Sequence, residues 1–450
     1  MSRRSNKHVL RLWMNGAFVG TWAAKPNSTE TLEYDAAWSA SDQGRPISLS
    51  LPFTPGNAPL QSDRVSNFFE NLLPDNNEIR KRVASRFQLG STDAFELLRE
   101  AGRDCVGALQ VLPDDMTPTD VQTVNATPLS DAEVAQVLRD TLSPRPLGGR
   151  YINEEDFRIS IAGAQEKTAL LWFNGHWCRP HGSTPTTHIF KMPLGLIANM
   201  QYDMSESVEN EWLCSEILHA YGLPVARTKI EQFEDMKVLV VERFDRVWWD
   251  EPGAKPWLIR LPQEDMCQAT GTAPHLKYES DGGPGVSQIM KLLGGSLNPV
   301  RDRRTFFQAQ VLFWMLGAID GHAKNFSIFI RKGGAYELAP LYDVLSAYPF
   351  MGNGAKQLSP FKAKLAMAVR SKNAHWKIRE IQRKHWLAMG SKYGVVSPEE
   401  RGSDYVLDDL IARTPDVVSK VSAKIPAGFP QRVADTILEG LQAAANKLGG

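Results

Sequence analysis

The sequence has few cysteines and no long apolar run, and each absence narrows the class of protein. Four cysteines stand in 450 residues, none in a CxxC pair, so neither a disulfide framework nor a paired-cysteine redox motif is indicated. The N-terminal stretch MSRRSNKHVLRLWMNG lacks the apolar segment of a secretory signal. The most apolar run, residues 306–319, includes Gln308 and Gln310 and is shorter than the roughly 20 residues that a membrane span needs. We therefore expect a protein of the reducing cytoplasm that does not enter a membrane.

The chain also lacks an excess of charge of either sign. Lys plus Arg and Asp plus Glu both number 51, so any nucleic-acid-binding surface must be local. The clearest candidate is residues 362–386, with eight Lys or Arg residues and one acid, Glu380. We interpret this stretch as the solvated face of a helix, with phosphate contact as the alternative.

Several common catalytic and metal-binding motifs are missing. We find no Walker A motif, no G-x-G-x-x-G loop and no G-x-S-x-G nucleophile elbow. Cys178, His181 and His188 suggest zinc, but a fourth ligand and a CxxC pair are lacking, so we disfavour a zinc site. Gly282, Gly283 and Gly285 are interpreted as a turn before a helix.

Two sequence signals mark the organisation of the first 142 residues. Asn15 and Gly16 join two β-rich runs, which is the strongest short signal for a hairpin. Helical patterns in residues 64–74 and 91–102 and an apolar strand in residues 106–113 follow. Residues 114–128 are polar and Pro-containing, and Ser130 with Glu133 then forms a capping box for a helix reaching about Leu142. We place the first domain boundary in residues 114–128.

The remainder divides into a β-rich portion and a helical portion. Strands are predicted in residues 167–172, 188–192 and 237–241, with a helix over residues 207–221 between the last two; helices dominate from about residue 262. We predict an α+β fold with domains at residues 1–120, 130–255 and 256–450, the last two being lobes on either side of a cleft.

The loop in AIDGHAKNFSIFI, residues 318–330, carries the densest chemistry. It joins an apolar helix, expected to end at Ile319, to an apolar strand beginning at Phe326. Asp320 and Asn325 have the spacing of a protein-kinase catalytic loop, in which the Asp accepts the substrate hydroxyl proton and the Asn binds a metal ion. Two strand-like runs and then Asp343 follow, in the order expected for the second metal-binding residue. The helix, hairpin and second Asp together favour phosphoryl transfer over the alternative that these acids cap turns.

A kinase-like site also needs a lysine, a hinge and a loop that covers phosphates. Lys191 ends an apolar strand where packing gives a lysine no purpose, and the following helix offers Glu211, or less favourably Glu209, as its ion-pair partner. The end of the strand KVLVV resembles a hinge, with Glu242 and Phe244 placed to give backbone contacts to adenine; a plain strand end is the alternative.

The loop that covers phosphates is predicted in RISIAGAQEKTAL. Its small residues Ala162, Gly163 and Ala164 would let backbone N–H groups approach an anion closely, between Ser160 on one side and Lys167 on the other. The alternative is that the same residues form a simple hairpin turn.

Eight segments together closely resemble the HipA toxin kinases of bacterial HipBA toxin-antitoxin systems. They are NFFENLLPDNN, GRDCVGALQVLP, DFRISIAGAQEKTALL, PTTHIFKMP, VERFDR, RLPQEDMCQ, KYESDGGPG and DGHAKNFSIFI. The resemblance implies a two-lobed protein-kinase-like fold with a β-rich N-terminal domain peculiar to the family and a helical C-terminal lobe. It also implies a Ser/Thr kinase that uses ATP and Mg²⁺, a helix-turn-helix antitoxin partner of the HipB type, operator DNA bound within that complex, and a protein substrate such as an aminoacyl-tRNA synthetase.

The resemblance assigns roles to individual residues. It implies that Asp320 is the catalytic base with Lys324 beside it, that Asn325 and Asp343 hold Mg²⁺, and that Ser160 is autophosphorylated. The implied nucleotide-binding residues are Ala162, Gly163, Ala164, Gln165, Glu166, Lys167, Lys191, Glu242, Arg243, Phe244, His322, Ala323, Lys324, Asn325, Tyr342 and Asp343.

Two other functions compete with a protein kinase. The first is a small-molecule phosphotransferase, which uses an Asp and an Asn in a similar loop. In such enzymes His and Gly usually precede the Asp, whereas Ala318 and Ile319 precede Asp320 here. The other is a protein that acts chiefly as a corepressor with its antitoxin on DNA.

Overall fold

The N-terminal region is a small antiparallel sheet covered by short helices. The computed structural model describes residues 8–24, 29–142, 159–160, 165–196, 202–253, 255–354 and 356–450. The N-terminal sheet has the order β4-β3-β2-β1-β6, with β1 at His8–Met14, β2 at Ala17–Ala24, β3 at Thr31–Tyr34, β4 at Leu60–Gln61 and β6 at Leu109–Pro113. Its helices are α1 (Ala36–Ala40), α2 (Asp63–Glu70), α3 (Asn77–Arg86) and α4 (Ala94–Ala101).

Local sequence signals explain the first elements. The predicted hairpin is confirmed: Asn15 and Gly16 both have positive φ, as a tight two-residue turn between twisted strands requires. Trp22 on β2 stacks on Phe69 of α2 with ring centroids 3.7 Å apart, so the helix covers one face of the sheet. The helices predicted in residues 64–74 and 91–102 are confirmed as α2 and α4.

A second sheet, called the middle sheet here, has the order β14-β15-β11-β9-β10-β7. Its strands are β7 (Ala126–Pro128), β9 (Lys167–Phe173), β10 (His176–Pro180), β11 (His188–Lys191), β14 (Thr228–Phe233) and β15 (Met236–Glu242). Helices α5 (Asp131–Leu142) and α6 (Ser207–Ala220) pack against it. Along β15, Val238 and Val240 join the core beneath α5, whereas Leu239 and Val241 join the core beneath α6, so both faces of the sheet are covered.

The capping box predicted for α5 is present. The Ser130 N–H donates to the Glu133 carboxylate at 2.8 Å, and the Glu133 N–H donates to the Ser130 hydroxyl at 3.3 Å. β7, however, lies within residues 114–128, the stretch predicted as a boundary, and forms an edge of the middle sheet.

Short strand pairs connect the regions. They are β5 (Asp104–Cys105) with β8 (Ile159–Ser160), β12 (Gly195–Leu196) with β13 (Asp203–Met204), and β16 (Arg246–Trp249) with β17 (Trp257–Arg260). Buried Asp104 on β5 binds the guanidinium groups of Arg243 at 3.1 Å, Arg246 at 2.9 Å and Arg260 at 3.4 Å. This cluster of buried charges ties the N-terminal region to the strands that follow the middle sheet.

The C-terminal region is mainly helical. Its helices are α7 (Met266–Thr270), α8 (Val286–Leu293), α9 (Pro299–Met315), α10 (Arg383–Lys392), α11 (Ser403–Ser422) and α12 (Gln431–Gly449). Its strands are β18 (Gln263–Asp265), β19 (Ser327–Ile330), β20 (Tyr336–Leu338), β21 (Lys364–Arg370) and β22 (Ala374–Lys377). The turn predicted from Gly282, Gly283 and Gly285 is confirmed, since it leads directly into α8.

Two predictions about this region are wrong. The helix expected to end at Ile319 ends at Met315, because Gly317 adopts positive φ and the Ala318 N–H returns to the Phe313 carbonyl at 2.7 Å, which closes the helix. Residues 362–386, interpreted as a helical face, instead form the β21–β22 hairpin and the start of α10. β21 carries Met367 and Val369 into the main core, and this packing overrides the helical interpretation of the basic residues.

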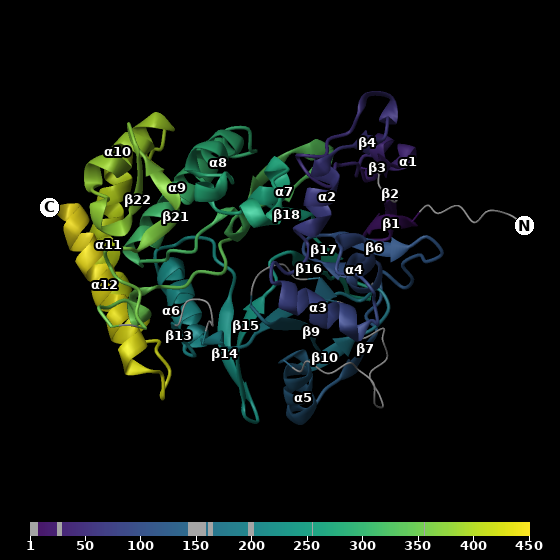
Figure 1. The fold of residues 1–450 in the computed structure, drawn as a ribbon, viewed down its shortest axis with the longest axis horizontal. Coiled ribbons are helices and arrows are strands. Elements are labelled where there is room, and N and C mark those ends of the chain that lie inside the picture. Colours follow the sequence, from purple (N-terminus) through teal and green to yellow (C-terminus); the bar gives the residue numbers. More distant parts are fainter. Residues whose placement is uncertain are drawn as a thin grey trace, which may run out of the picture.

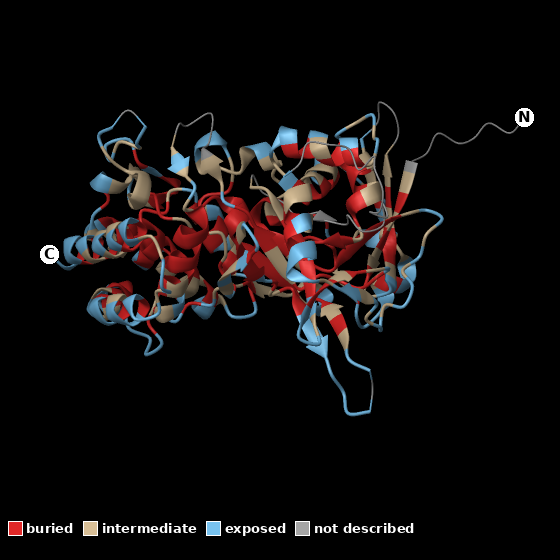
Figure 2. Cartoon of the chain, turned by 90° about the horizontal axis from the view of Figure 1, so that it is seen from below, coloured by how far each residue is buried: buried red, intermediate tan, exposed pale blue. Residues whose placement is uncertain are grey.

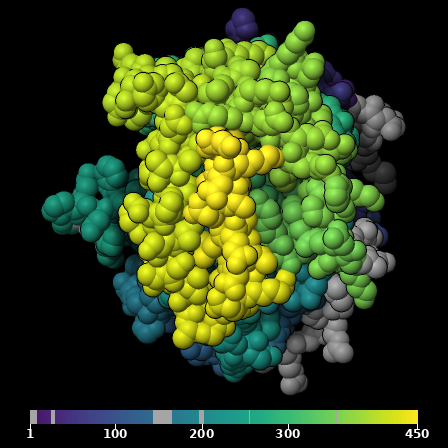
Figure 3. Space-filling view, turned by 90° about the vertical axis from the view of Figure 1, so that its left-hand side faces the viewer, coloured from purple at the N-terminus to yellow at the C-terminus, as the bar shows by residue number. Residues whose placement is uncertain are grey.

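The three regions follow one another along the molecule. The N-terminal sheet lies at one end of the long axis and helices α10 to α12 at the other (Figure 1). Buried residues continue through the middle from one end to the other (Figure 2), and α12 lies across the C-terminal face (Figure 3). Among the described residues, no helix combines the length and apolar character needed to cross a membrane.

Candidate active site

A cavity of about 200 Å³ lies where the three regions meet. Most of the predicted catalytic and nucleotide-binding residues line it: Gln165, Lys167, Lys191, Glu242, Arg243, Phe244, Asp320, His322, Lys324, Asn325, Tyr342 and Asp343. The fold therefore brings together residues that lie far apart in the sequence.

The loop after α9 is held by its own backbone. The His322 N–H donates to the Asp320 carbonyl at 2.8 Å, and the Asn325 amide nitrogen donates to the carbonyls of Asp320 at 3.1 Å and Asp343 at 3.2 Å. Because its nitrogen is engaged with backbone, the Asn325 side chain has its oxygen as the atom that can accept a cation. Asp320 itself is exposed, and its Oδ1 accepts a hydrogen bond from the Tyr278 hydroxyl at 2.5 Å.

Asp343 follows β20 in an unusual backbone conformation. Its φ is +60°, a region that residues other than glycine seldom occupy and that concentrates at functional sites. The conformation places its carboxylate beside Lys191, with Lys191 Nζ 2.6 Å from Asp343 Oδ1. The loop after β20 is thereby tied to the middle sheet.

Lys191 bridges two carboxylates. Its Nζ also lies 2.6 Å from Glu211 Oε1 on α6, so the predicted Lys191–Glu211 pair is formed. The alternative, Glu209, pairs with Lys237 instead. Burial alone would lower the pKa of Lys191, but Asp343 and Glu211 hold that pKa above its ordinary value. Lys191 therefore stays charged, and burial in turn raises the pKa of Glu211 despite its lysine.

Two neighbouring titratable side chains, Lys167 and His322, complete this wall of the cavity. The pKa of Lys167 is lowered to about 8, mainly by burial and then by the nearby charge of Lys191. Burial likewise lowers the pKa of His322. The Nδ1 of His322 is buried and has no hydrogen-bond partner among the described residues, so it is a polar atom that a ligand can satisfy.

The last residues of the loop after α9 pack inward. Lys324 is buried and its Nζ lies 2.6 Å from Asp75 Oδ1, which comes from the N-terminal region. Tyr342 donates its hydroxyl to the Lys324 carbonyl at 2.7 Å and so links the loop to the segment that carries Asp343. Ala323 is buried, and its N–H donates to the Lys277 carbonyl at 3.2 Å.

The segment predicted as a hinge follows β15 at the cavity edge. The N–H groups of Glu242 and Arg243 donate to the carbonyls of Arg227 and Thr187, so these two donors serve the fold. The guanidinium of Arg243 is engaged with Asp104 and with Asp245 at 2.9 Å. The ring of Phe244 packs edge-on against Phe329 with centroids 5.8 Å apart and thus forms an apolar wall.

The predicted phosphate-covering loop is described in part. Ala162, Gly163 and Ala164 lie outside the described residues, and for Ser160 the backbone alone is described, paired in parallel with Cys105. The Gln165 side-chain amide donates to the Met192 carbonyl at 2.5 Å. Glu166 forms an ion pair with Arg82 of α3, so the N-terminal region contacts the chain on both sides of residues 161–164.

The three zinc candidates have other partners. Cys178 contacts backbone carbonyls, His181 contacts Thr127, and His188 contacts Thr187. In the described part of the chain, no three His, Cys, Asp or Glu side chains are grouped so as to hold a metal.

Comparisons with known proteins agree across nearly the whole chain. Residues 10–112 match the model of the HipA N-terminal domain, and residues 159–418 match that of the HipA-like C-terminal domain. A putative kinase, Y4mE of Sinorhizobium fredii, is 32% identical over 92% of this chain and 91% of its own length. The chain belongs to the HipA family.

Further HipA relatives support the fold. The Ser/Thr-protein kinase toxin HipA of Shewanella oneidensis is 28% identical over 76% of this chain and 73% of its own. A solved structure of Shewanella oneidensis HipA with HipB and operator DNA has a TM-score of 0.77 at 23% identity, over 98% of this chain and 97% of that chain. The predicted mixed fold, β-rich at the N-terminus and helical at the C-terminus, is thus confirmed.

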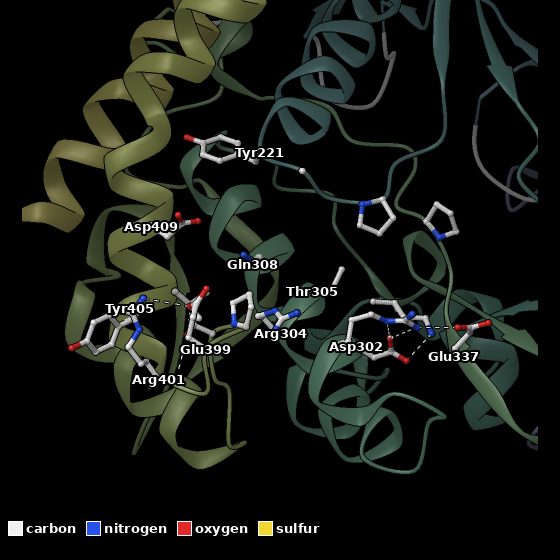
Figure 4. A pocket seen from close by; sticks show the side chains of 18 of the residues that line it. Tyr221, Asp302, Arg304, Thr305, Gln308, Glu337, Glu399, Arg401, Tyr405 and Asp409 are labelled. Atoms are coloured by element: carbon white, nitrogen blue, oxygen red, sulfur yellow. Dashed lines mark hydrogen bonds and ion pairs between the residues drawn. The ribbon is translucent and has the colours of Figure 1, made fainter.

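A larger hollow of about 850 Å³ lies elsewhere on this HipA-family chain. It is bounded by α9, α11 and the loop before α11, and it contains none of the predicted site residues (Figure 4). Most of its arginines are already paired, for example Arg301 with Glu337 at 2.9 Å and Arg413 with Asp409 at 3.3 Å. Although this hollow is larger than the cavity, we therefore do not assign the active site to it.

Among the residues that the prediction from sequence missed are two that contact the loop of residues 320–325. Tyr278 contacts Asp320, and Asp75 contacts Lys324, although 249 residues separate the last two. Tyr278 and Asp75 both stand in segments that resemble the family, but local spacing gives no signal that two such distant segments meet.

Proposed function

We propose that the chain is an ATP-dependent Ser/Thr protein kinase whose nucleotide lies in the cavity described above. The observation that carries this proposal is the convergence of Asp320, Asn325, Asp343 and Lys191 on one cavity, with Lys191 ion-paired to a glutamate on α6. A phosphoryl-transfer site needs a base for the attacking hydroxyl, hard oxygen ligands for a divalent cation and a cation for the phosphates.

Each residue has a separate task in this reaction. Asp320 accepts the proton of the acceptor hydroxyl, whose oxygen attacks the γ-phosphorus of ATP while ADP leaves. Lys191 and Lys324 bind phosphate oxygens of ATP, and His322 Nδ1 faces these oxygens. Phe244 packs against the adenine. Residues 242–244 form the hinge through backbone groups other than the N–H groups of Glu242 and Arg243, which are engaged within the fold.

The oxygen atoms of Asn325 and Asp343 fit a magnesium ion. They supply one amide and one carboxylate oxygen, the sparse protein set that suits Mg²⁺ when phosphates and water complete its coordination. When bound, Mg²⁺ neutralises phosphate charge and orients the group to be transferred. The positive φ of Asp343 is the backbone feature that presents its carboxylate to the cavity.

The family relation supports proposals for the regulation and the partners of this chain. We propose that Ser160 is autophosphorylated and that its phosphate, with about 1.5 to 2 negative charges, displaces the predicted phosphate-covering loop, residues 162–167, from its position over the nucleotide. The family relation and the solved Shewanella oneidensis complex support a HipB-type antitoxin and operator DNA as partners. A protein of the translation machinery, such as an aminoacyl-tRNA synthetase, is the proposed substrate.

The test separates a protein kinase from its two rivals. Wild-type protein and Asp320→Asn are incubated with γ-labelled ATP and a bacterial lysate, and protein and small-molecule fractions are counted separately. We expect label in protein with the wild type alone, and a synthetase among the labelled proteins. Label confined to small molecules would indicate the small-molecule phosphotransferase, and no transfer by either protein would leave the corepressor as the better account.

A further inference from the structure

One wall of the cavity comes from outside the two kinase lobes. Asn71, Leu72 and Asp75 line it from the segment between α2 and α3. That segment is fixed to the start of the C-terminal region, because the side-chain amides of Asn67 and Asn71 donate to the carbonyls of Gly271 and Thr272, each at 2.9 Å. Asp75 is therefore held at the cavity by a rigid attachment.

Asp75 is shared by two lysines. Its Oδ1 lies 2.6 Å from Lys324 Nζ, and its Oδ2 lies 2.9 Å from Lys277 Nζ. The side chains of Asp75, Lys324 and Lys277 are 13%, 4% and 15% exposed, so water screens these charges weakly. Burial would raise the pKa of Asp75, but Lys324 and Lys277 hold it below its ordinary value. The carboxylate thus offsets the repulsion between two ammonium groups that converge on it.

The contact fixes the lysine beside the proposed metal ligand. Lys324 stands between the base Asp320 and Asn325 in the loop, and its Nζ also approaches the Asn71 carbonyl at 3.4 Å. An ammonium group has three donors, so Lys324 can keep Asp75 and the Asn71 carbonyl and still direct one N–H into the cavity. Asp75 need not release the lysine when a phosphate arrives.

We propose that Asp75 is a positioning residue of the kinase site, through which the N-terminal region aims Lys324 at the transferring phosphoryl group. Asp75 touches neither ATP nor the acceptor hydroxyl. Without it, Lys277 and Lys324 would repel each other, and Lys324 would leave its position relative to Asp320. The N-terminal region is then a required part of the catalytic unit.

This inference rests on the proposed function, and its experiment is arranged to separate the two. Wild type, Asp75→Asn, Asp75→Glu, Asp75→Asn with Lys277→Met, and the exposed control Asp63→Asn are compared. Each is tested for folding by thermal unfolding, for MgATP affinity by calorimetry, and for kcat and KM in transfer of the γ-phosphoryl group to protein.

We expect Asp75→Asn to lower kcat about tenfold to a hundredfold while KM for ATP changes less than about threefold, because misplacing a catalytic group by about 1 Å costs of this order. Asp75→Glu and the Lys277→Met double variant should each recover part of kcat, since one restores the charge and the other removes the repelling cation. Asp63→Asn should equal wild type.

Three results would overturn the proposal. If Asp75→Asn equals wild type, or loses activity in proportion to folded protein with no recovery in the other variants, Asp75 does not position Lys324. If KM for ATP falls and kcat rises, Asp75 restrains Lys324 from the phosphates instead. Absence of transfer by the wild type itself would reject the kinase assignment, which is a separate failure.

Discussion

Removing Lys191 tests how the buried charges of the site are balanced. The change Lys191→Met keeps the length and apolar stem of the side chain but takes the ammonium from Glu211 and Asp343, each 2.6 Å away. The Glu211 side chain is 4% exposed, so it cannot be hydrated in place, whereas Asp343 at 34% can be. We therefore expect Glu211 to take up a proton in the variant.

The cost of that protonation can be worked out. The ordinary pKa of a glutamate is 4.5, so holding Glu211 neutral at pH 7 costs about 3.4 kcal/mol at about 1.36 kcal/mol per pH unit, and this is the upper limit of the loss because burial already raises the pKa of Glu211 in the wild type. Loss of one partner of a buried pair costs about 3–5 kcal/mol, which agrees. A carboxyl whose pKa is raised in the folded state destabilises the fold above pH 4.5. The loss of unfolding free energy in Lys191→Met therefore grows as the pH rises, and it should fall to about 1 kcal/mol near pH 5.

The assay is urea unfolding at pH 5 and pH 7. Lys191→Met should lose up to about 3 kcal/mol at pH 7, and the further change Glu211→Gln should restore most of it. Lys81→Met, which removes the lysine paired with Glu78 on α3, should leave the free energy of unfolding nearly unchanged because these two side chains are 65% and 75% exposed. An equal loss at both pH values, or no recovery with Glu211→Gln, would refute the charge-balance reasoning.

Two further predictions concern Tyr278 and Glu264. Tyr278 donates a hydrogen bond to Oδ1 of Asp320, the proposed base, and so competes with the substrate hydroxyl for that carboxylate. Tyr278→Phe is therefore expected to raise kcat/KM for a protein acceptor about threefold or more, with MgATP affinity unchanged in calorimetry; a fall would show that Tyr278 orients Asp320. Burial raises the pKa of Glu264 to about 8, so the wild type should lose stability as the pH rises from 4.5 to 8, by at most about 1.4 kcal/mol per pH unit. Glu264→Gln should remove that slope in urea unfolding, and an unchanged slope would count against a protonated Glu264.

Local signals in the sequence predicted much of the fold. The Asn15–Gly16 turn, the Ser130–Glu133 capping box and the order of loop, hairpin and Asp343 depend on neighbouring residues, and each is present in the structure. The sequence predicts the wrong end for α9 even though it contains Gly317. The apolar run continues to Ile319, and periodicity alone does not show where a glycine will adopt positive φ.

The remaining features depend on contacts between distant segments. Nothing near Asp75 in the sequence indicates that it meets Lys324 and Lys277, since the contact arises from the docking of the α2–α3 segment on α7. The basic stretch of residues 362–386 was assigned to a helix from its charge, whereas core packing of β21 decides its conformation. Charge patterns report exposure, and they do not distinguish a hairpin from a helix.

The central claim is that Asp320 is the base of a phosphoryl-transfer site, and one measurement tests it most directly. Wild type and Asp320→Asn are compared for MgATP affinity and for the rate of γ-phosphoryl transfer to protein under single-turnover conditions. The account predicts equal MgATP affinity and a rate lower by about 10² to 10⁴ fold in the variant, the usual effect of losing a general base. Transfer at the wild-type rate by Asp320→Asn would contradict it.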